Sequence, residues 1–152
     1  MINTTNLNEA RKQAEKLKKE GKPIAVLSQD DEFNRKALEI KGLNMLVMNE
    51  NIEYKDYMKQ RSSGLNEVLV KICADKNIAI GVQIDEIAKK EGIDKAKSLA
   101  RLAQNIMLLK KAGAKLVLVS EDKQVDKRAI SSVLLSLGAS TKQAKEASSI
   151  FK

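Results

Sequence analysis

The stretch RSSGLNEVLVKICADKNIAIGV, residues Arg61–Val82, decides the fold class of this chain. Apolar residues recur at helical spacing in its middle part, Leu65–Lys76, and an almost unbroken aliphatic run, Ile78–Val82, follows. A continuous run of this kind is typical of a strand that is covered on both faces, as in a parallel sheet. The stretch therefore predicts a loop, a helix and a buried strand in that order. It offers no obvious catalytic side chain.

The rest of the chain repeats this alternation of helix and strand. Further strands are predicted at Ile24–Ser28, Asn44–Met48 and Lys115–Val119. Helical patterns cover Asp31–Lys41, Asp94–Ala112, Asp126–Leu137 and the residues from Ser140 to the terminus, and the polar start, Met1–Lys22, fits an amphipathic first helix. Alternating strands and helices predict βα units around a parallel sheet, which is the α/β class. No shift in composition divides the sequence, so residues 1–152 are predicted to form one domain.

Composition narrows the function. The chain has 28 Lys and Arg against 20 Asp and Glu, a net charge of +8, which favours a polyanionic partner such as nucleic acid, although solvated lysine faces produce the same excess. It has no histidine, the commonest general base and metal ligand, and only two Tyr and two Phe for stacking on bases. The lone cysteine, Cys73, fits a small buried hydrophobe in a reducing compartment. We expect a cytoplasmic protein, since no signal peptide and no membrane-length apolar run is present.

Acidic residues follow each predicted strand, in the segments Ser28–Glu32, Asn49–Asn51, Gln83–Glu86 and Ser120–Asp122. Ligands gather at the carboxyl ends of strands in α/β folds, so these carboxylates could hold Mg²⁺ or Mn²⁺. Capping of the next helix is the favoured interpretation, with Asp31, Asp85 and Asp126 as the expected caps.

Four stretches, taken together, resemble the archaeal ribonuclease P protein component 3 family, the counterpart of the thirty-kilodalton protein subunit of the eukaryotic enzyme. They are NRKALEIKGLNMLV (Asn34–Val47), the opening stretch Arg61–Val82, ARLAQNIMLLKKAGAKLVLVS (Ala100–Ser120) and RAISSVLLSLGASTKQAKEAS (Arg128–Ser148). The third contains the family's Arg-x-x-x-Asn-Ile helix. Two positions depart from the family: Glu67 stands where histidine is frequent, and Ala129 where aspartate commonly follows the arginine.

The resemblance implies a fold and a function. The fold would be TIM-barrel-like βα repeats around a parallel sheet, shortened or incomplete relative to an eight-stranded barrel. The function would be that of a non-catalytic RNA-binding subunit of ribonuclease P, the ribonucleoprotein endonuclease that removes 5′ leaders from precursor tRNA. Catalysis would reside in the RNA subunit with Mg²⁺, and the protein itself would bind no cofactor. The implied partners are ribonuclease P RNA, precursor tRNA, component 2 and other protein subunits, without a membrane.

Matching basic positions supply most of the predicted RNA-binding residues, and Ser63 and Gly64 are added because Ser62-Ser63-Gly64, at the head of a helix, could hold a phosphate on free backbone N–H groups. The predicted RNA-binding residues are Arg35, Arg61, Ser63, Gly64, Lys71, Lys76, Arg101, Lys111 and Arg128. No catalytic residue or metal ligand is predicted. Arginine and lysine side chains suit phosphate groups. Each of these basic residues taken alone could instead be a solvated surface residue, and Lys76 could cap the end of a helix. Ser62-Ser63-Gly64 could be a simple capping turn. Leu134 and Ile150 are candidate contacts for component 2. The alternatives are a carboxylate-dependent metal phosphohydrolase of the TIM-barrel type and a generic RNA-binding module of the translation apparatus.

Overall fold

The structure is a computed structural model, and it describes residues 1–52, 56, 62–121 and 126–147. Within these residues the predicted alternation of helices and strands is confirmed. The elements in chain order are α1 (Leu7–Lys19), β1 (Ile24–Leu27), α2 (Asp31–Ala37), β2 (Leu43–Met48), α3 (Glu67–Asp75), β3 (Ala79–Gln83), α4 (Ile84–Lys89), α5 (Gly92–Ala112), β4 (Leu116–Val119), α6 (Lys127–Ser136) and α7 (Thr141–Ala147). The sequence pattern did not predict α4, and the helix predicted over Asp31–Lys41 ends early, at Ala37.

The four strands form one parallel sheet in the order β1-β2-β3-β4. Each strand pairs with its neighbour in sequence, for example Leu46 with Ile80 and Ile80 with Leu116. The predicted α/β class with a parallel sheet is therefore confirmed. The N-terminal segment adds an isolated parallel bridge to the outer side of β1: the Ile2 N–H donates to the Ala25 carbonyl, and the Leu27 N–H donates to the Ile2 carbonyl.

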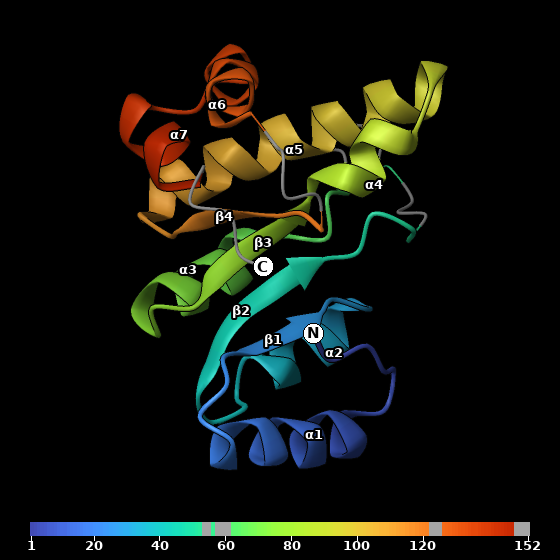
Figure 1. The fold of residues 1–152 in the computed structure, drawn as a ribbon, viewed down its shortest axis with the longest axis vertical. Helices are drawn as coiled ribbons and strands as arrows, with labels where there is room; N and C mark the ends of the chain where they lie inside the picture. The colour runs from blue at the N-terminus through green and yellow to red at the C-terminus, as the bar shows by residue number, and fades with distance from the viewer. Residues whose placement is uncertain (53–55, 57–61, 122–125, 148–152) are drawn as a thin grey trace.

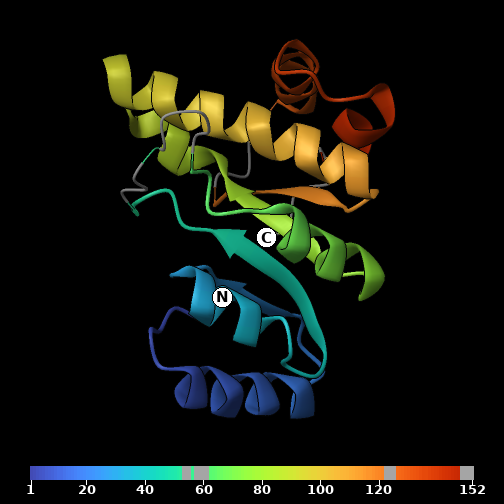
Figure 2. The same cartoon turned by 180° about the vertical axis from the view of Figure 1, so that it is seen from behind.

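The two faces of the sheet differ. Residues that alternate along the strands, such as Val26, Leu46 and Ile80, belong to a large hydrophobic core with buried residues of the helices. The residues between them, such as Met45 and Val47, form a second, smaller cluster that contains strand residues only. The helices that contribute buried apolar side chains thus cover one face, as in the outer layer of a (βα) barrel, and the ribbon shows the sheet curving between α1 at one end and α5 at the other (Figures 1 and 2).

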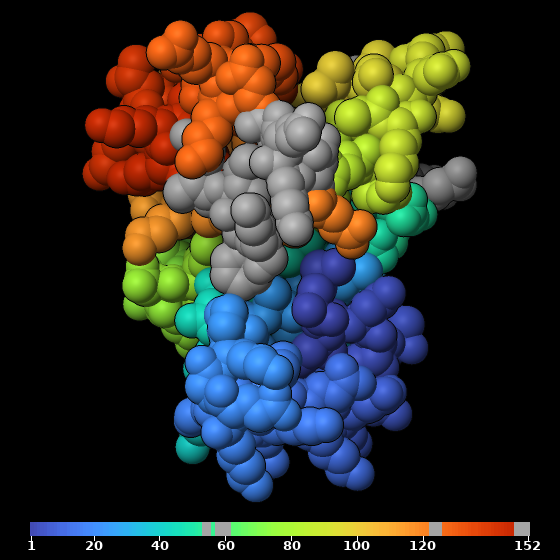
Figure 3. Space-filling model, viewed as in Figure 1, coloured from blue at the N-terminus to red at the C-terminus, as the bar shows by residue number. Residues whose placement is uncertain are grey.

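The order of the strands also sets the outer shape of the molecule. Because each βα unit lies beside the unit that precedes it in sequence, the first and the last units lie at opposite ends of the sheet. The space-filling view shows the N-terminal units, in blue, at one end of the molecule and α6 and α7, in orange and red, at the other (Figure 3).

Side chains that begin the helices explain their boundaries. Asn6, Asp30, Asn66 and Asp126 each accept a backbone N–H of the first turn as N-caps of α1, α2, α3 and α6. The expected cap at Asp126 is confirmed. The cap of α2 is Asp30 and not Asp31, because the helix already begins at Asp31.

Two further boundaries agree with the sequence. Gly113 ends α5 with φ +69°, the left-handed conformation that glycine adopts at low cost. Ser140 and Gln143 form a reciprocal pair before α7: the Gln143 N–H donates to Ser140 Oγ, and the Ser140 N–H donates to Gln143 Oε1. Among the residues that the structure describes, none of the helices combines the length and apolar character needed to cross a lipid bilayer.

Candidate nucleic-acid interface

The predicted RNA-binding residues separate into groups at different places in the fold. Ser63, Gly64 and Arg101 lie near the segment that follows β2, on the carboxyl side of the sheet. Four more lie within or just after α2, α3 and α5, the helices that run back toward the amino ends of the strands. They are Arg35, Lys71, Lys76 and Lys111. Arg128 stands on α6, and Arg61 lies outside the described residues.

The loop before α3 packs directly against α5. Gly64 has φ +74°, and both it and Ser63 are buried. The Asn105 side-chain amide donates from Nδ2 to the Ser63 carbonyl over 3.4 Å. Two motifs of the sequence, the Ser-Gly-Leu block and the Arg-x-x-x-Asn-Ile helix, therefore meet here. Because Ser63 is only 3% exposed, it shapes this loop rather than presenting a side chain to solvent.

Two buried polar atoms in this contact, Ser63 Oγ and Asn105 Oδ1, have no hydrogen-bond partner among the described residues. A small hollow beside them measures about 10 Å³ and is lined by Met48, Asn49, Glu50, Ile52, Ser63, Arg101 and Asn105. That size is at the lower limit for holding one water molecule. The sequence reasoning did not single out Asn105, although it lies within the quoted Arg-x-x-x-Asn-Ile motif.

Arg101 is part of a partly buried group of charges next to this contact. Its side chain is 18% exposed, and its Nη2 lies 3.8 Å from the Asp56 carboxylate. Lys90 Nζ donates to Ser98 Oγ over 2.9 Å and lies 3.8 Å from the Glu50 carboxylate. Burial raises the pKa of the Glu50 carboxyl above its usual value, against the opposing effect of the Lys90 charge. A hollow of about 390 Å³ opens over this group, with charges of both signs along its walls.

The basic residues on α2 and α3 face solvent. Arg35 and Lys71 are exposed. Lys76 follows the last residue of α3, and its Nζ donates to the Leu38 carbonyl at the end of α2 over 2.9 Å. Lys76 therefore joins two neighbouring βα units, an attachment across 38 residues that the sequence did not indicate.

Lys111 lies on the last turn of α5 and pairs with Glu67 at 2.8 Å, where both side chains are at least 70% exposed. The hydrogen bond between them lowers the pKa of Glu67 and raises the pKa of Lys111. Exposed ion pairs of this kind contribute little to stability and exchange readily with other partners. Glu67, the position that departs from the family's histidine, thus faces a cation in this chain.

The predicted protein contact on α6 needs a correction. Leu134 is 2% exposed and belongs to the hydrophobic core, so it cannot offer an apolar surface to a partner; Ile150 lies outside the described residues. The exposed apolar residues of α6 are its neighbours, Val133 and Leu135. The helical period brings residue 134 inward, one step away from the positions that face solvent.

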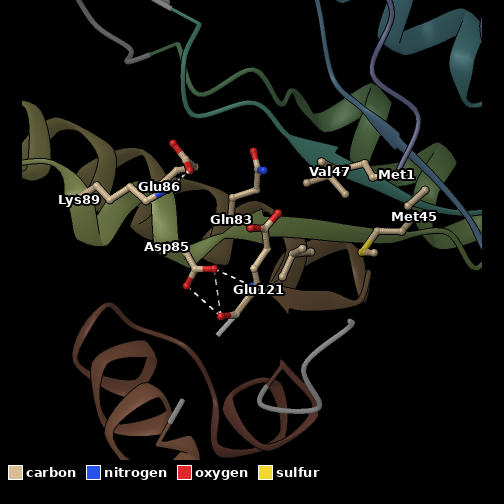
Figure 4. A pocket seen from close by; sticks show the side chains of 11 residues that line it. Met1, Met45, Val47, Gln83, Asp85, Glu86, Lys89 and Glu121 are labelled. Carbon is tan, nitrogen blue, oxygen red and sulfur yellow. Dashed lines mark hydrogen bonds and ion pairs between the residues drawn. The ribbon is translucent and has the colours of Figure 1, made fainter. Parts of the chain in front are cut away.

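A hollow of about 630 Å³ lies on the sheet face that the described helices leave uncovered, next to the carboxyl ends of β3 and β4 (Figure 4). Asp85 was expected to cap the next helix, but no side chain among the described residues caps α4 or α5. Both carboxylate oxygens of Asp85 accept from Ser120 Oγ, at 2.8 and 3.1 Å, and one also accepts the Glu121 N–H at 2.7 Å. Asp85 therefore holds the segment after β4 in place.

The neighbouring Glu86 carboxylate pairs with Lys89 at 2.7 Å. Over residues 1–52, 56, 62–121 and 126–147, no three Asp, Glu, Cys or His side chains are grouped so that they could hold a metal ion. The carboxylates described above at the strand ends thus serve in caps, ion pairs and hydrogen bonds to the segment after β4, and no observation favours the metal phosphohydrolase.

Comparison with known proteins agrees with the resemblance seen in the sequence. Curated relatives include a Ribonuclease P protein component 3 of Methanococcus maripaludis, 25% identical over 119 residues, which are 78% of this chain and 48% of the relative. A protein of the same name from Methanosarcina acetivorans is 38% identical over 61 residues, 40% of this chain and 26% of the relative. The similarity to archaeal component 3 proteins is thereby confirmed. No family model matches the chain.

A protein chain in the cryo-EM structure of archaeal Ribonuclease P with mature tRNA has the same fold. The TM-score is 0.77 at 22% identity, and the match covers 96% of this chain and 62% of that chain. The predicted partial TIM-barrel-like architecture is thus confirmed. The chain spans about half the length of the Methanococcus relatives that it matches.

Proposed function

We propose that this chain is a non-catalytic, RNA-binding protein subunit of ribonuclease P, the endonuclease that removes 5′ leaders from precursor tRNA. The observation that carries the proposal is the agreement of two likenesses: the curated relatives are named for component 3 of this enzyme, and the fold matches a chain of the archaeal complex over nearly the whole sequence. In the assembled enzyme, this chain would contact ribonuclease P RNA, precursor tRNA, component 2 and further protein subunits in the cytoplasm.

The charges of the chain support an RNA partner. Exposed Lys and Arg side chains, among them Arg35, Lys71 and Arg128, are available to phosphate groups, while few aromatic residues are available for stacking on single-stranded bases. Neutralising phosphate repulsion would help the RNA to fold. We therefore assign cleavage to the RNA subunit with its Mg²⁺, and to the protein a reduction of the Mg²⁺ concentration that the RNA requires.

The test is a reconstitution of precursor-tRNA cleavage with the cognate RNA and proteins, with and without this chain, over a range of Mg²⁺ concentrations. Adding the chain should raise the cleavage rate or lower the Mg²⁺ requirement, and the chain alone should leave precursor tRNA intact. No effect on the complete mixture would overturn the proposal. Robust Mg²⁺-dependent cleavage by the purified chain alone would instead point to a hydrolase.

A further inference from the structure

The topology places four connections of the chain along one edge of the sheet. In each βα unit the helix runs opposite to the strands, so its last turn and the link to the next strand lie at the amino ends of the strands. The segments from the last helical turn to the residue before the strand are 16–23, 34–42, 72–78 and 109–115. In chain order they lie from bottom to top along the left side of Figure 1 and the right side of Figure 2. We call this edge the amino-edge surface.

The amino-edge surface accounts for the whole net charge of the chain. Its segments contain eleven of the 28 Lys and Arg residues and three of the 20 Asp and Glu residues, which leaves 17 of each sign elsewhere. All eleven cations are exposed. They are Lys16, Lys18, Lys19, Lys22, Arg35, Lys36, Lys41, Lys76, Lys110, Lys111 and Lys115. The acidic residues of the surface are Glu20, Glu39 and Asp75.

Stabilisation of helix ends explains only part of this concentration. A helix C-terminus carries roughly half a negative charge, so four of them place about two negative charges at this edge, against a side-chain excess of eight positive charges. The effect of the dipole falls off within the last turn. Lys22, Lys41 and Lys115 stand beyond the helix ends, in the links to β1, β2 and β4, and the dipole does not account for them.

The cations of neighbouring units are held close together. The aliphatic stem of Lys18 lies 3.8 Å from the point where a Cβ on Gly42 would be, which places the first link against the second. The bond from Lys76 to the Leu38 carbonyl joins the second unit to the third. Adjacent strands lie about 4.8 Å apart, so the four links span roughly 15 Å. Three cations of this surface form exposed ion pairs, Lys22 with Glu20, Lys36 with Glu32 and Lys111 with Glu67, and such pairs are easily exchanged for phosphate.

We propose that the amino-edge surface binds the phosphate backbone of a double-helical RNA element, on the side of the sheet opposite the carboxyl strand ends where α/β enzymes hold their ligands. The choice of RNA over other polyanions rests on the proposed function. Lysines act as point charges without the planar fork of arginine, so contact of this kind is independent of sequence. A-form RNA is recognised through its shape and phosphates, which fits a curved row of cations fixed by a rigid sheet.

The test compares two triple variants of the full chain with equal net charge. The first, Lys22→Gln, Lys41→Gln and Lys115→Gln, changes exposed link residues of the amino-edge surface. The control, Lys12→Gln, Lys89→Gln and Lys142→Gln, changes exposed lysines elsewhere. The probe is a fluorescent RNA hairpin of about 20 base pairs, followed by anisotropy between about 50 and 300 mM KCl.

Each lost phosphate contact should flatten the plot of log affinity against log salt by about 0.7 to 0.9 units, so the link variant should lose about 2 to 3 units of slope. At about 0.1 M salt this corresponds to a loss of affinity on the order of 100-fold or more. The control should keep nearly the wild-type slope. Both variants should melt within about 2 °C of the wild type, because exposed surface changes have small effects on stability.

Equal losses in the two variants would show that only net charge matters and would overturn the inference, as would a wild-type protein that does not bind the hairpin. Binding of polyglutamate instead of the hairpin through the same lysines would overturn it in favour of an acidic protein. Failure of the proposed function is a separate result: the wild type would bind the hairpin with the predicted slope yet leave reconstituted cleavage unchanged. A link variant that binds the hairpin as the wild type does and still stimulates cleavage would overturn the proposal for the amino-edge surface and leave the proposed function standing.

Discussion

Replacing Gly81 by Ala should destabilise the sheet, which reverses the usual effect of this substitution. Gly81 lies in the middle of β3, opposite Val47 and Val117 of the neighbouring strands. A Cβ at this position would lie 2.7 Å from Met45 Sδ and 3.0 Å from Val47 Cγ2. Gly81 is not among the glycines with positive φ, so its backbone accepts alanine. Where space allows, such a replacement stabilises a protein by about 0.4–1 kcal/mol through the unfolded state.

The crowding sets the expected magnitude. Overpacking a core by a methyl group costs about 1–3 kcal/mol. Met45 borders the hollow of Figure 4 and can yield, whereas the β-branched Val47 cannot rotate freely, so we expect a net loss of roughly 1–2 kcal/mol. For a chain of this length, that loss lowers the melting temperature by roughly 2–8 °C. Urea unfolding followed by circular dichroism measures it.

A double-mutant cycle identifies the cause. Met45→Ala alone should cost about 2–5 kcal/mol because it leaves a cavity. Adding Gly81→Ala to that variant should cost less than it does in the wild type, with a coupling energy of at least about 0.5 kcal/mol. If Gly81→Ala melts at or above the wild-type temperature, or if the two changes are additive, the close approach of β3 and β2 at this point is not what constrains residue 81.

Two further predictions concern buried titratable groups. Burial raises the pKa of the Glu50 carboxyl, so the folded chain binds a proton at Glu50 more readily than the unfolded chain does. The folded chain therefore loses stability as the pH rises from the ordinary pKa of a glutamate through the raised pKa of Glu50. Glu50→Gln should therefore raise the urea midpoint near pH 7 and leave it unchanged near pH 3; an equal shift at both pH values would contradict this. Burial also raises the pKa of the Cys73 thiol to about 11. A thiol reagent near pH 8 should therefore modify the native protein far more slowly than the protein unfolded in urea. Prompt modification of the native protein would show that Cys73 is accessible.

Much of the fold could be predicted from the sequence because the strands are aliphatic and short. Each of the four predicted strands appears within one residue of its predicted ends, since most side chains on both faces of the strands are buried, which leaves a nearly continuous apolar signal. The helix α4 carried no such signal. It has six residues, it follows β3 without a loop, and no side chain caps its first turn. Asp85 was expected to cap the next helix, but its partners, Ser120 and Glu121, lie 35 and 36 residues further along the chain, where local patterns do not reach.

The candidate site was harder to predict than the fold. The sequence identified the basic residues but not where they lie on the surface, because the identity of a basic residue does not show at which edge of the sheet its side chain lies. Arg101 and Lys76 illustrate the difference: Arg101 is partly buried beside Asp56, and Lys76 is tied to the Leu38 carbonyl. The alternation of strands and helices does predict this position for one group of residues, since every link from a helix to the next strand lies at the same edge of the sheet. Lys22, Lys41 and Lys115 all stand in such links, so the alternation groups them by their sequence positions alone.

The strand order also determines how the chain can fold. Every strand of the sheet pairs with the strand that precedes or follows it in sequence, and none has to wait for a distant segment. Each pairing closes a loop of about 19 to 36 residues, from Ile24–Leu43 to Ile80–Leu116, and such a loop has a smaller entropic cost than one that joined β1 directly to β4 would have. The sheet can therefore grow one βα unit at a time during synthesis from the N-terminus, with β1 and β2 paired before β4 has left the ribosome.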